Sequence, residues 1–275
     1  MLAPLACTVR GCHRPLTRTD QQLSCSARHT FDVARSGYVS LLQPQDRRSA
    51  APGDTKEAVA ARARLLDAGI GRDAIDAIVA RAPASDGPLV ASDLGCGSGE
   101  LLGALAAARD VCAVGIDLST AAAEAAARRF PSLTWIVANV DRALPLLDGS
   151  VHLVTSLNGR RHAAECARVL RPGGMVIVAL PAPDDLIELR EQVQGEGVTR
   201  DRADAVVAEH APRFELVERF TVRQRHRLAG GALRDLLRGT YRGARDSMVE
   251  RVKTLDALGT LDVTVASDVA VMKKA

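Results

Sequence analysis

Residues 93–100, Asp-Leu-Gly-Cys-Gly-Ser-Gly-Glu, decide how the rest of the chain is interpreted. The apolar run Leu89-Val-Ala leads into them, and the helix-favouring residues 101–108 follow. This order predicts a buried strand, a glycine turn and a helix that begins at the turn. Alternate glycines let the backbone of such a turn approach a ligand without a Cβ in the way. They stand at Gly95, Gly97 and Gly99.

The spacing of these glycines argues against a nicotinamide dinucleotide. A dinucleotide site takes G-x-G-x-x-G, and its third glycine would fall where this chain has Glu100. The G-x-G-x-G form with an acid ahead of it, Asp93, instead suits a ligand with a cationic amino-acid end. A second predicted strand ends at Asp117, 22 residues after Gly95, where a carboxylate can accept both hydroxyls of a ribose.

Strands and helices alternate along the middle of the chain. We expect strands at 89–94, 111–117, 133–138, 151–157 and 174–180, and helices near 99–108, 120–129, 161–169 and 184–193. This alternation predicts an α/β fold with a parallel, doubly wound, Rossmann-like sheet. Two helices precede the sheet, within 54–81, and a strand, a helix and a last strand follow it, at 215–228, 232–239 and 261–271. With the glycine turn and Asp117, this organisation resembles the class I S-adenosylmethionine-dependent methyltransferases.

Composition bounds the size and the location of the protein. The chain has 275 residues, of which 47% are hydrophobic, enough for one large domain or for one domain with an appendage. No apolar run approaches the length of a membrane span, and the first residues lack the basic start of a signal peptide. We therefore expect a cytoplasmic protein that does not enter the membrane.

A group of cysteines near the N-terminus predicts a metal site. In a reducing compartment, crowded cysteines favour metal binding over disulfides. Three thiolates and one imidazole follow the pattern C-x4-C-x12-C-x3-H and make a closed tetrahedral set for structural zinc, namely Cys7, Cys12, Cys25 and His29. His13 could replace His29, but it directly follows Cys12, and joint ligation by adjacent residues is strained. We predict a zinc-binding RNA-recognition module at 1–42, a linker with helices at 43–88 and a methyltransferase domain at 89–275.

Positive charge is concentrated near both ends of the chain. Residues 1–50 hold seven arginines and three aspartates, and residues 219–245 hold eight arginines and one aspartate. Two basic segments around an acidic middle fit a cofactor domain between surfaces that meet a polyanion, although a solvated basic face without a partner is the alternative. Four of the later arginines alternate and would share one face of a strand, where we predict phosphate contacts: Arg219, Arg223, Arg225 and Arg227.

Several motifs in a fixed order point to one family. They are the cysteine module, Phe31-Asp32 with Gly37-Tyr38, Pro52-Gly53-Asp54, Leu66-Asp67-Ala68-Gly69, the turn at 93–99, Gly115-Ile-Asp-Leu-Ser119, the segment 168–174 and Leu186-Ile-Glu-Leu-Arg190. Over most of the chain this order resembles the RlmA-type 23S ribosomal RNA guanine-N1 methyltransferases. The Arg- and Ala-rich composition is similar to that of members from macrolide producers, which include the tylosin-resistance methyltransferase.

The resemblance implies two cofactors and their ligands. Zinc would be held by the three cysteines and His29, although the first cysteine pair of the family is usually spaced C-x2-C. S-adenosylmethionine would be held by Asp93, Gly95, Gly97, Gly99, Glu100, Asp117, Leu118, Asn139, Asp185 and Leu186. Asp185 stands where the family commonly has His, and Asn139 follows the third predicted strand, where class I enzymes hold the adenine. The implied substrate is a guanine in a 23S rRNA hairpin that lines the peptide exit tunnel, with macrolide resistance as the consequence and a homodimer as the assembly.

The catalytic base and the class of function are not fixed by the sequence. Guanine N1 carries a proton at neutral pH, so the enzyme must orient N1 and offer a proton acceptor. Asp184 and Asp185 lie at the carboxyl end of the fifth predicted strand and are candidates, but N-capping of the next helix is their alternative role. A small-molecule methyltransferase of a biosynthetic pathway stays open, as does a zinc-bearing RNA-binding protein with an inactive cofactor domain.

Overall fold

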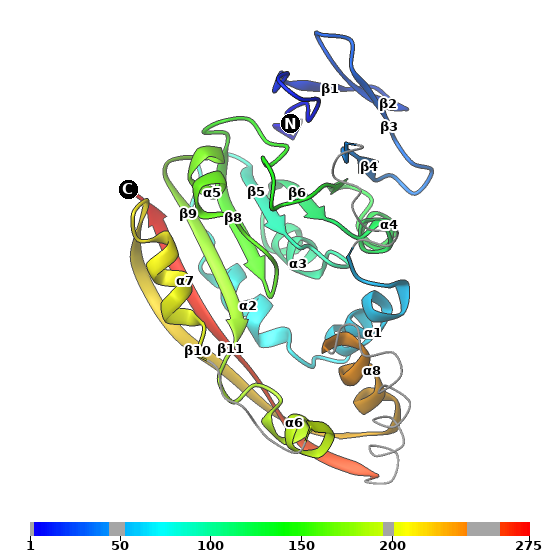
Figure 1. The fold of residues 1–275 in the computed structure, drawn as a ribbon, viewed down its shortest axis with the longest axis vertical. Helices are drawn as coiled ribbons and strands as arrows, with labels where there is room; N and C mark the ends of the chain where they lie inside the picture. The colour runs from blue at the N-terminus through cyan, green and yellow to red at the C-terminus, as the bar shows by residue number, and fades with distance from the viewer. Residues whose placement is uncertain (1–2, 44–52, 195–200, 241–258) are drawn as a thin grey trace.

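The computed structural model describes residues 3–43, 53–194, 201–240 and 259–275. Its main sheet has eight strands in the order β10-β11-β9-β8-β5-β6-β7-β4 (Figure 1). Their bounds are β4 (Val39–Ser40), β5 (Leu89–Leu94), β6 (Val111–Asp117), β7 (Thr134–Val137), β8 (Val151–Leu157), β9 (Leu170–Pro181), β10 (Phe214–Ala229) and β11 (Thr260–Lys274). Strands β4 to β9 are parallel to one another, which confirms the predicted doubly wound core. The last two strands differ, because β11 is antiparallel to both β9 and β10.

Helices cover both faces of the sheet. They are α1 (Lys56–Asp67), α2 (Arg72–Ala80), α3 (Glu100–Ala108), α4 (Thr120–Arg129), α5 (Ala163–Val169), α6 (Ile187–Gln194), α7 (Ala203–His210) and α8 (Gly230–Thr240). Alternate residues of β5 point to opposite faces, so Leu89 packs with α2, α3 and α4 whereas Leu94 packs with α5 and α7. Helix α7 has no counterpart among the predicted helices, and no helix in the described ranges is long and apolar enough to cross a membrane.

The N-terminal module contributes to the core of the main sheet. Its three short antiparallel strands are β1 (Leu16–Arg18), β2 (Gln22–Cys25) and β3 (Thr30–Asp32). Residues 138–150, all of them described, form the crossover from β7 to β8 and hold no helix. No crossover helix therefore covers this part of the sheet face. Leu5, Leu16 and Leu23 share a hydrophobic cluster with core residues of β6 and β7 such as Ile116 and Ile136. The module and the 138–150 segment together occupy the place that a crossover helix would fill.

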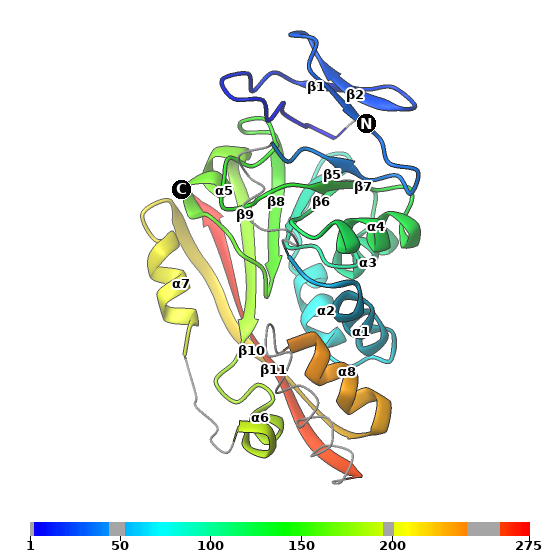
Figure 2. The ribbon, with the colours of Figure 1, turned by 45° about the vertical axis from the view of Figure 1, so that its right-hand side comes forward.

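Strands β10 and β11 reach beyond the rest of the sheet. β11 pairs with β9 only over Ser267–Lys273, whereas it pairs with β10 along nearly its whole length. The remaining part forms a two-stranded arm that runs toward α6 and α8 (Figures 1 and 2). An apolar cluster that includes Leu65 of α1, Leu189 of α6, Leu237 of α8 and Val263 of β11 joins these elements. The arm and the helices on it therefore form one packed unit at the carboxyl edge of the parallel strands.

Candidate functional site

The glycine turn lies at the point where the order of the parallel strands reverses. β5 is the central strand; β6 lies on one side of it and β8 on the other. In doubly wound sheets, ligands bind in the crevice at the carboxyl ends of the strands at such a point. The turn is fixed to the end of β6, because the amides of Gly95 and Cys96 donate to the Ile116 carbonyl at 2.8 and 3.1 Å. The structure therefore puts the predicted turn where this fold binds its ligands.

The three glycines of the turn share a left-handed backbone, and Gly99 and Gly97 differ in what surrounds them. All have positive φ, at +78° for Gly95, +54° for Gly97 and +90° for Gly99. A Cβ on Gly99 would lie 2.5 Å from Cη2 of Trp135, so packing within the protein excludes a side chain there. A Cβ on Gly97 would meet nothing within 4 Å. Gly97 therefore borders open space, as a close backbone approach to a ligand requires.

Asp93 is a buried carboxylate at the end of β5. Its residue is 3% exposed, and Thr155 Oγ1 on β8 donates to it at 2.7 Å. Burial raises the pKa of Asp93 to about 7; the neighbouring acids Asp117 and Glu100 add to this, and the Thr155 hydrogen bond opposes it. Thr155 is the only polar partner of this carboxylate in the described part of the chain. A cationic group would stabilise the ionised form, so Asp93 fits the ammonium end of an amino-acid ligand.

Asp117 and Asn139 lie beside the turn. The Asp117 carboxylate accepts the Gly97 amide at 3.0 Å and the Ser119 amide at 2.8 Å, and Leu118 lies between these anchored positions. Burial raises the pKa of Asp117 above its ordinary value, although the two amides oppose this. The carbonyl of Asp117 accepts the Ala138 amide at 3.0 Å, which places Asn139 next to the end of β6. The structure thus brings the predicted ribose acid and the predicted adenine segment to one edge.

Residues 53 and 54, with which the second described range begins, also reach this edge. Gly53 has φ +82°, and a Cβ on it would lie 2.7 Å from the Ser119 amide nitrogen. Ser119 Oγ donates to the Asp54 carbonyl at 2.7 Å. The Asp54 side chain pairs with Arg62 of α1, which also donates to the Gly239 carbonyl at 2.9 Å. The sequence motif Pro-Gly-Asp indicated this segment, but nothing in the sequence predicted that it packs against the end of β6.

Three predicted cofactor residues have side chains engaged by protein groups. The buried Glu100 carboxylate accepts the Ser98 hydroxyl at 2.7 Å and lies 3.7 Å from Arg129 Nη1. Asp185 accepts the Ala266 amide of β11 at 2.9 Å, and burial raises its pKa to about 6. Leu186 is buried in the apolar cluster under the arm. Cofactor contacts by these three residues stay predictions.

The neighbouring Asp184 is ion-paired. Nε and Nη2 of Arg223 on β10 donate to its carboxylate at 2.7 and 3.0 Å. This pairing holds the pKa of Asp184 below its ordinary value. Asp184 therefore stays ionised at neutral pH but has little affinity for a proton, which weakens it as a general base.

The four predicted zinc ligands converge. Their Sγ and Nδ1/Nε2 atoms all lie within 4.8 Å of one another. Nδ1 of His29 is 3.4 Å from Cys7 Sγ and 3.5 Å from Cys25 Sγ, and the Cys12 and Cys25 sulfurs are 3.8 Å apart. A zinc tetrahedron with Zn–S of about 2.3 Å and Zn–N of about 2.0 Å has S···S edges of about 3.8 Å and S···N edges of about 3.5 Å. The three short distances match the edges of this tetrahedron, so the four side chains suit a zinc ion.

His13, the alternative zinc ligand, instead makes contacts outside the zinc site. Its Nε2 lies 3.2 Å from Asp148 Oδ1, which also accepts Arg168 Nη1 at 2.6 Å. Arg168 in turn donates to the carbonyls of Leu144 and Leu146 at 2.9 Å each. His13 therefore connects the zinc module to the 138–150 segment, and His29 completes the ligand set.

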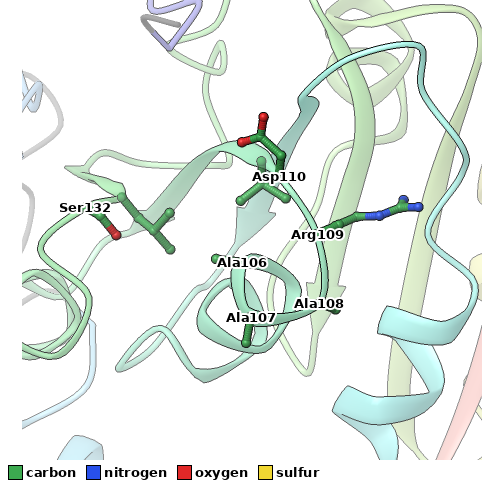
Figure 3. Close-up of a pocket in the computed structure, with 8 residues that line it drawn as sticks. Ala106, Ala107, Ala108, Arg109, Asp110 and Ser132 are labelled. Carbon is green, nitrogen blue, oxygen red and sulfur yellow. The ribbon is translucent and has the colours of Figure 1, made fainter.

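A shallow pocket lies at the opposite edge of the sheet, between the end of α3 and the starts of β6 and β7 (Figure 3). It is lined by Ala106, Ala107, Ala108, Arg109, Asp110, Val111, Ser132 and Leu133, and more of its lining surface is polar than apolar. Ligands of doubly wound sheets bind at the carboxyl edge instead. This pocket is therefore separate from the site formed by the glycine turn.

The fold and site together define a class of enzyme. A doubly wound sheet carries a buried acid and a glycine turn at the end of its central strand, with a second acid at the end of the next strand. A Cys3His group fit for zinc precedes it. The protein is a class I S-adenosylmethionine-dependent methyltransferase with a structural zinc module.

Comparison with known proteins identifies the family within that class. Residues 6–50 match the family described as "RlmA, N-terminal", and residues 91–174 match the family described as "Methyltransferase domain". The 23S rRNA (guanine(748)-N(1))-methyltransferase of Streptomyces fradiae is 37% identical over 227 residues, 81% of this chain and 80% of that protein. A candidate 23S rRNA (guanine-N1)-methyltransferase of Micromonospora griseorubida is 35% identical over 83% of this chain and 82% of that protein. The chain belongs to the RlmA-type family of 23S rRNA guanine-N1 methyltransferases.

The similarity to solved structures supports the fold alone. The YcgJ protein of Bacillus subtilis matches with a TM-score of 0.52 at 13% identity, over 74% of this chain and 98% of that chain. At this identity the match concerns the sheet and its helices and says nothing about the substrate.

Proposed function

We propose that this protein methylates N1 of a guanine in a 23S rRNA hairpin that lines the peptide exit tunnel. The observation that carries the proposal is the joint presence of the acid and glycine-turn site and the Cys3His group, in a chain 37% identical to an enzyme named for guanine 748 of 23S rRNA. A small-molecule methyltransferase could use the same cofactor site. It would have no evident use for a zinc module that extends from the sheet.

The residues at the carboxyl edge would divide the work of holding the cofactor. S-adenosylmethionine supplies an electrophilic methyl group on a positively charged sulfur. In our proposal Asp93 pairs with its ammonium group, the backbone at Gly97 passes close to its amino-acid end, and Asp117 accepts the ribose hydroxyls. The open space at Gly97 supports this assignment, as does the fact that Thr155 is the one hydrogen-bond partner of the Asp93 carboxylate among the described residues.

The chemistry at the base requires a proton to leave. The N1–H bond breaks, the N1 electron pair forms the new N–C bond, and the electron pair of the broken S–C bond returns to sulfur. Asp184 is held ionised by Arg223 with a lowered pKa, so it is a poor acceptor. Asp185 has the higher pKa, but its carboxylate already accepts the Ala266 amide. We propose that orientation of N1 supplies most of the rate and that water accepts the proton.

Basic side chains on two surfaces would contact the RNA backbone. On β10 the four alternating arginines are exposed on one face, as predicted, but Arg219 pairs with Asp204 and Arg223 pairs with Asp184. Arg225 and Arg227 are therefore the better candidates for phosphate contacts on this strand. The zinc module adds exposed arginines such as Arg10 and Arg18. Binding that depends on such contacts weakens steeply as salt concentration rises.

Methyl transfer to RNA is the direct test. Purified protein is incubated with labelled S-adenosylmethionine and unmethylated 23S rRNA, and primer extension then locates the product. An N1-methyl group blocks Watson–Crick pairing, so a single stop in a hairpin of the exit tunnel would support the proposal. The Asp93→Ala variant is the negative control. Cofactor binding without incorporation into RNA would refute the rRNA assignment and favour the small-molecule alternative.

We further propose that this methylation confers macrolide resistance of the tylosin type. A susceptible strain that expresses the wild-type protein should tolerate more macrolide than one that expresses Asp93→Ala at the same level. Equal susceptibility of the two strains would refute the resistance role but would leave the RNA reaction intact. An rRNA substrate also implies a cytoplasmic enzyme, and sedimentation of the free protein would test the predicted homodimer.

A further inference from the structure

Asn158 has an unusual backbone conformation at the end of β8. Its φ is +57°, a left-handed conformation that only three other non-glycine residues of the described chain adopt: His13, Arg28 and Leu186. Asn tolerates this region better than most residues, but glycine tolerates it best. Such conformations cluster at functional sites when the surrounding structure enforces them. The residue therefore invites a search for what its side chain does.

The surrounding structure fixes the backbone of Asn158 at the ligand crevice. The Asn158 amide donates to the Ala179 carbonyl of β9 at 2.9 Å. A Cβ on the next residue, Gly159, would lie 2.2 Å from the Leu94 carbonyl oxygen, and a Cβ on Gly95 would lie 3.0 Å from the Gly159 Cα. The chain thus passes directly against the glycine turn with no side chain between them. Asn158 directly follows β8, which neighbours the central strand β5 at the point where the strand order reverses.

The Asn158 side chain is exposed, and its carboxamide has no hydrogen-bond partner in the described ranges of the chain. The two arginines that follow it each make a hydrogen bond within the protein, although the buried Nε of Arg161 has no partner among the described residues. Arg160 Nε donates to Asp141 Oδ1 at 2.8 Å, and Arg161 Nη1 donates to the Gly159 carbonyl at 3.2 Å. Next to the crevice, Asn158 therefore presents hydrogen-bonding groups that no described residue uses.

The chemistry of guanine N1 gives these groups a use. When N1 loses its proton, the negative charge is shared between N1 and the adjacent O6. A neutral N–H donor at O6 favours this charge without competing for the proton, and a carboxamide offers two such hydrogens. A carboxylate in the same place would repel the charge. A donor at O6 also orients the base and leaves N1 free to face the methyl group.

We propose that the Asn158 carboxamide donates a hydrogen bond to O6 of the target guanine, which orients the base and stabilises the charge that develops as N1 is deprotonated. This inference rests on the proposed guanine-N1 reaction. It assigns a substrate contact to a residue that the sequence motifs did not single out.

Replacement by glycine separates the side chain from the backbone. Asn158→Gly keeps the left-handed conformation and removes the whole side chain, including the carboxamide. Its melting temperature should equal that of the wild type within error, and its affinity for S-adenosylmethionine should stay within about twofold of the wild-type value. Its methylation of 23S rRNA should fall on the order of a hundredfold, as when one oxyanion donor is lost. Its pH–rate profile should shift to higher pH, because N1 must then ionise without help. Asn158→Asp should lose at least as much activity.

Ser132→Ala is a control substitution at the opposite edge of the sheet, prepared and assayed in the same way, and it should keep wild-type activity. Activity of Asn158→Gly within threefold of the wild type, or an unshifted pH profile, would overturn the inference while the guanine-N1 function stood. A lower melting temperature of Asn158→Gly would also overturn it, since the side chain would then serve folding. A wild-type protein inactive on RNA would instead refute the proposed function.

Discussion

The buried Asp93 should make cofactor affinity depend on pH near neutrality. Its pKa in the free protein is about 7 because the carboxyl is buried and has two acidic neighbours. We expect the ionised form to bind the ammonium group of S-adenosylmethionine and the protonated form not to bind it. The ionised fraction is roughly 91% at pH 8 and roughly 9% at pH 6. Affinity should therefore fall roughly tenfold between these values, with its midpoint near pH 7.

The same group gives the free protein an opposite dependence of stability. The pKa of Asp93 is raised from an ordinary 3.8 to about 7, so the folded state holds this proton more tightly than the unfolded state. Its contribution to stability is complete at low pH and is lost as pH rises through 4 to 7. Bound cofactor should reverse this loss. The cofactor should therefore raise the melting temperature more at pH 8 than at pH 6.

Isothermal titration from pH 6 to pH 8 measures the first effect, with two variants as controls. Asn in place of Asp93 keeps the shape of the side chain but cannot ionise, so its affinity should be low and independent of pH. Val in place of Thr155 removes the donor that opposes the raised pKa, so the midpoint should move to higher pH. Wild-type affinity that is flat over this range, or an Asp93→Asn variant that keeps the wild-type slope, would refute the reasoning.

Three further predictions concern packing, zinc and the candidate bases. Gly99→Ala should lower the free energy of unfolding by about 2–4 kcal/mol, because its Cβ would meet Trp135. Gly97→Ala should lower the free energy of unfolding by only about 1 kcal/mol but should weaken cofactor binding. Urea unfolding measures the two stabilities and titration measures the cofactor affinity; equal losses of stability would contradict the packing argument. Removal of zinc by a chelator should lower the melting temperature of the whole chain and not only of residues 1–42, since the module shares its core with the sheet; a separate early transition would contradict this. Asp184→Asn should change kcat less than about threefold because the ion-paired carboxylate is a poor base, and a hundredfold loss would identify it as the proton acceptor.

The local patterns of the sequence were sufficient for the parallel strands β5 to β9, for most of the helices and for the cofactor turn, but not for α7 or β4. Alternating apolar runs and helix-favouring runs predicted the parallel core, because each buried strand and each amphipathic helix carries its own signature. Spacing alone predicted the zinc ligands, since four ligands within 23 residues leave few other geometries. The acid before the glycines and the acid after β6 were likewise visible, because the chain direction fixes the edge at which they meet.

Contacts between distant segments were decided only in three dimensions. The antiparallel β10 and β11, the zinc module in place of a crossover helix and the docking of Gly53 on Ser119 all depend on which surfaces meet, which no local pattern encodes. The same holds for Asp93, whose pKa depends on burial and on Thr155 of another strand. Asn158 carried no signal in the sequence, because its significance comes from a backbone angle and from its place at the end of β8, next to the central strand β5. The sequence determined which groups reach the carboxyl edge of the sheet, and tertiary packing decided which of them are left without a protein partner and so can meet a ligand.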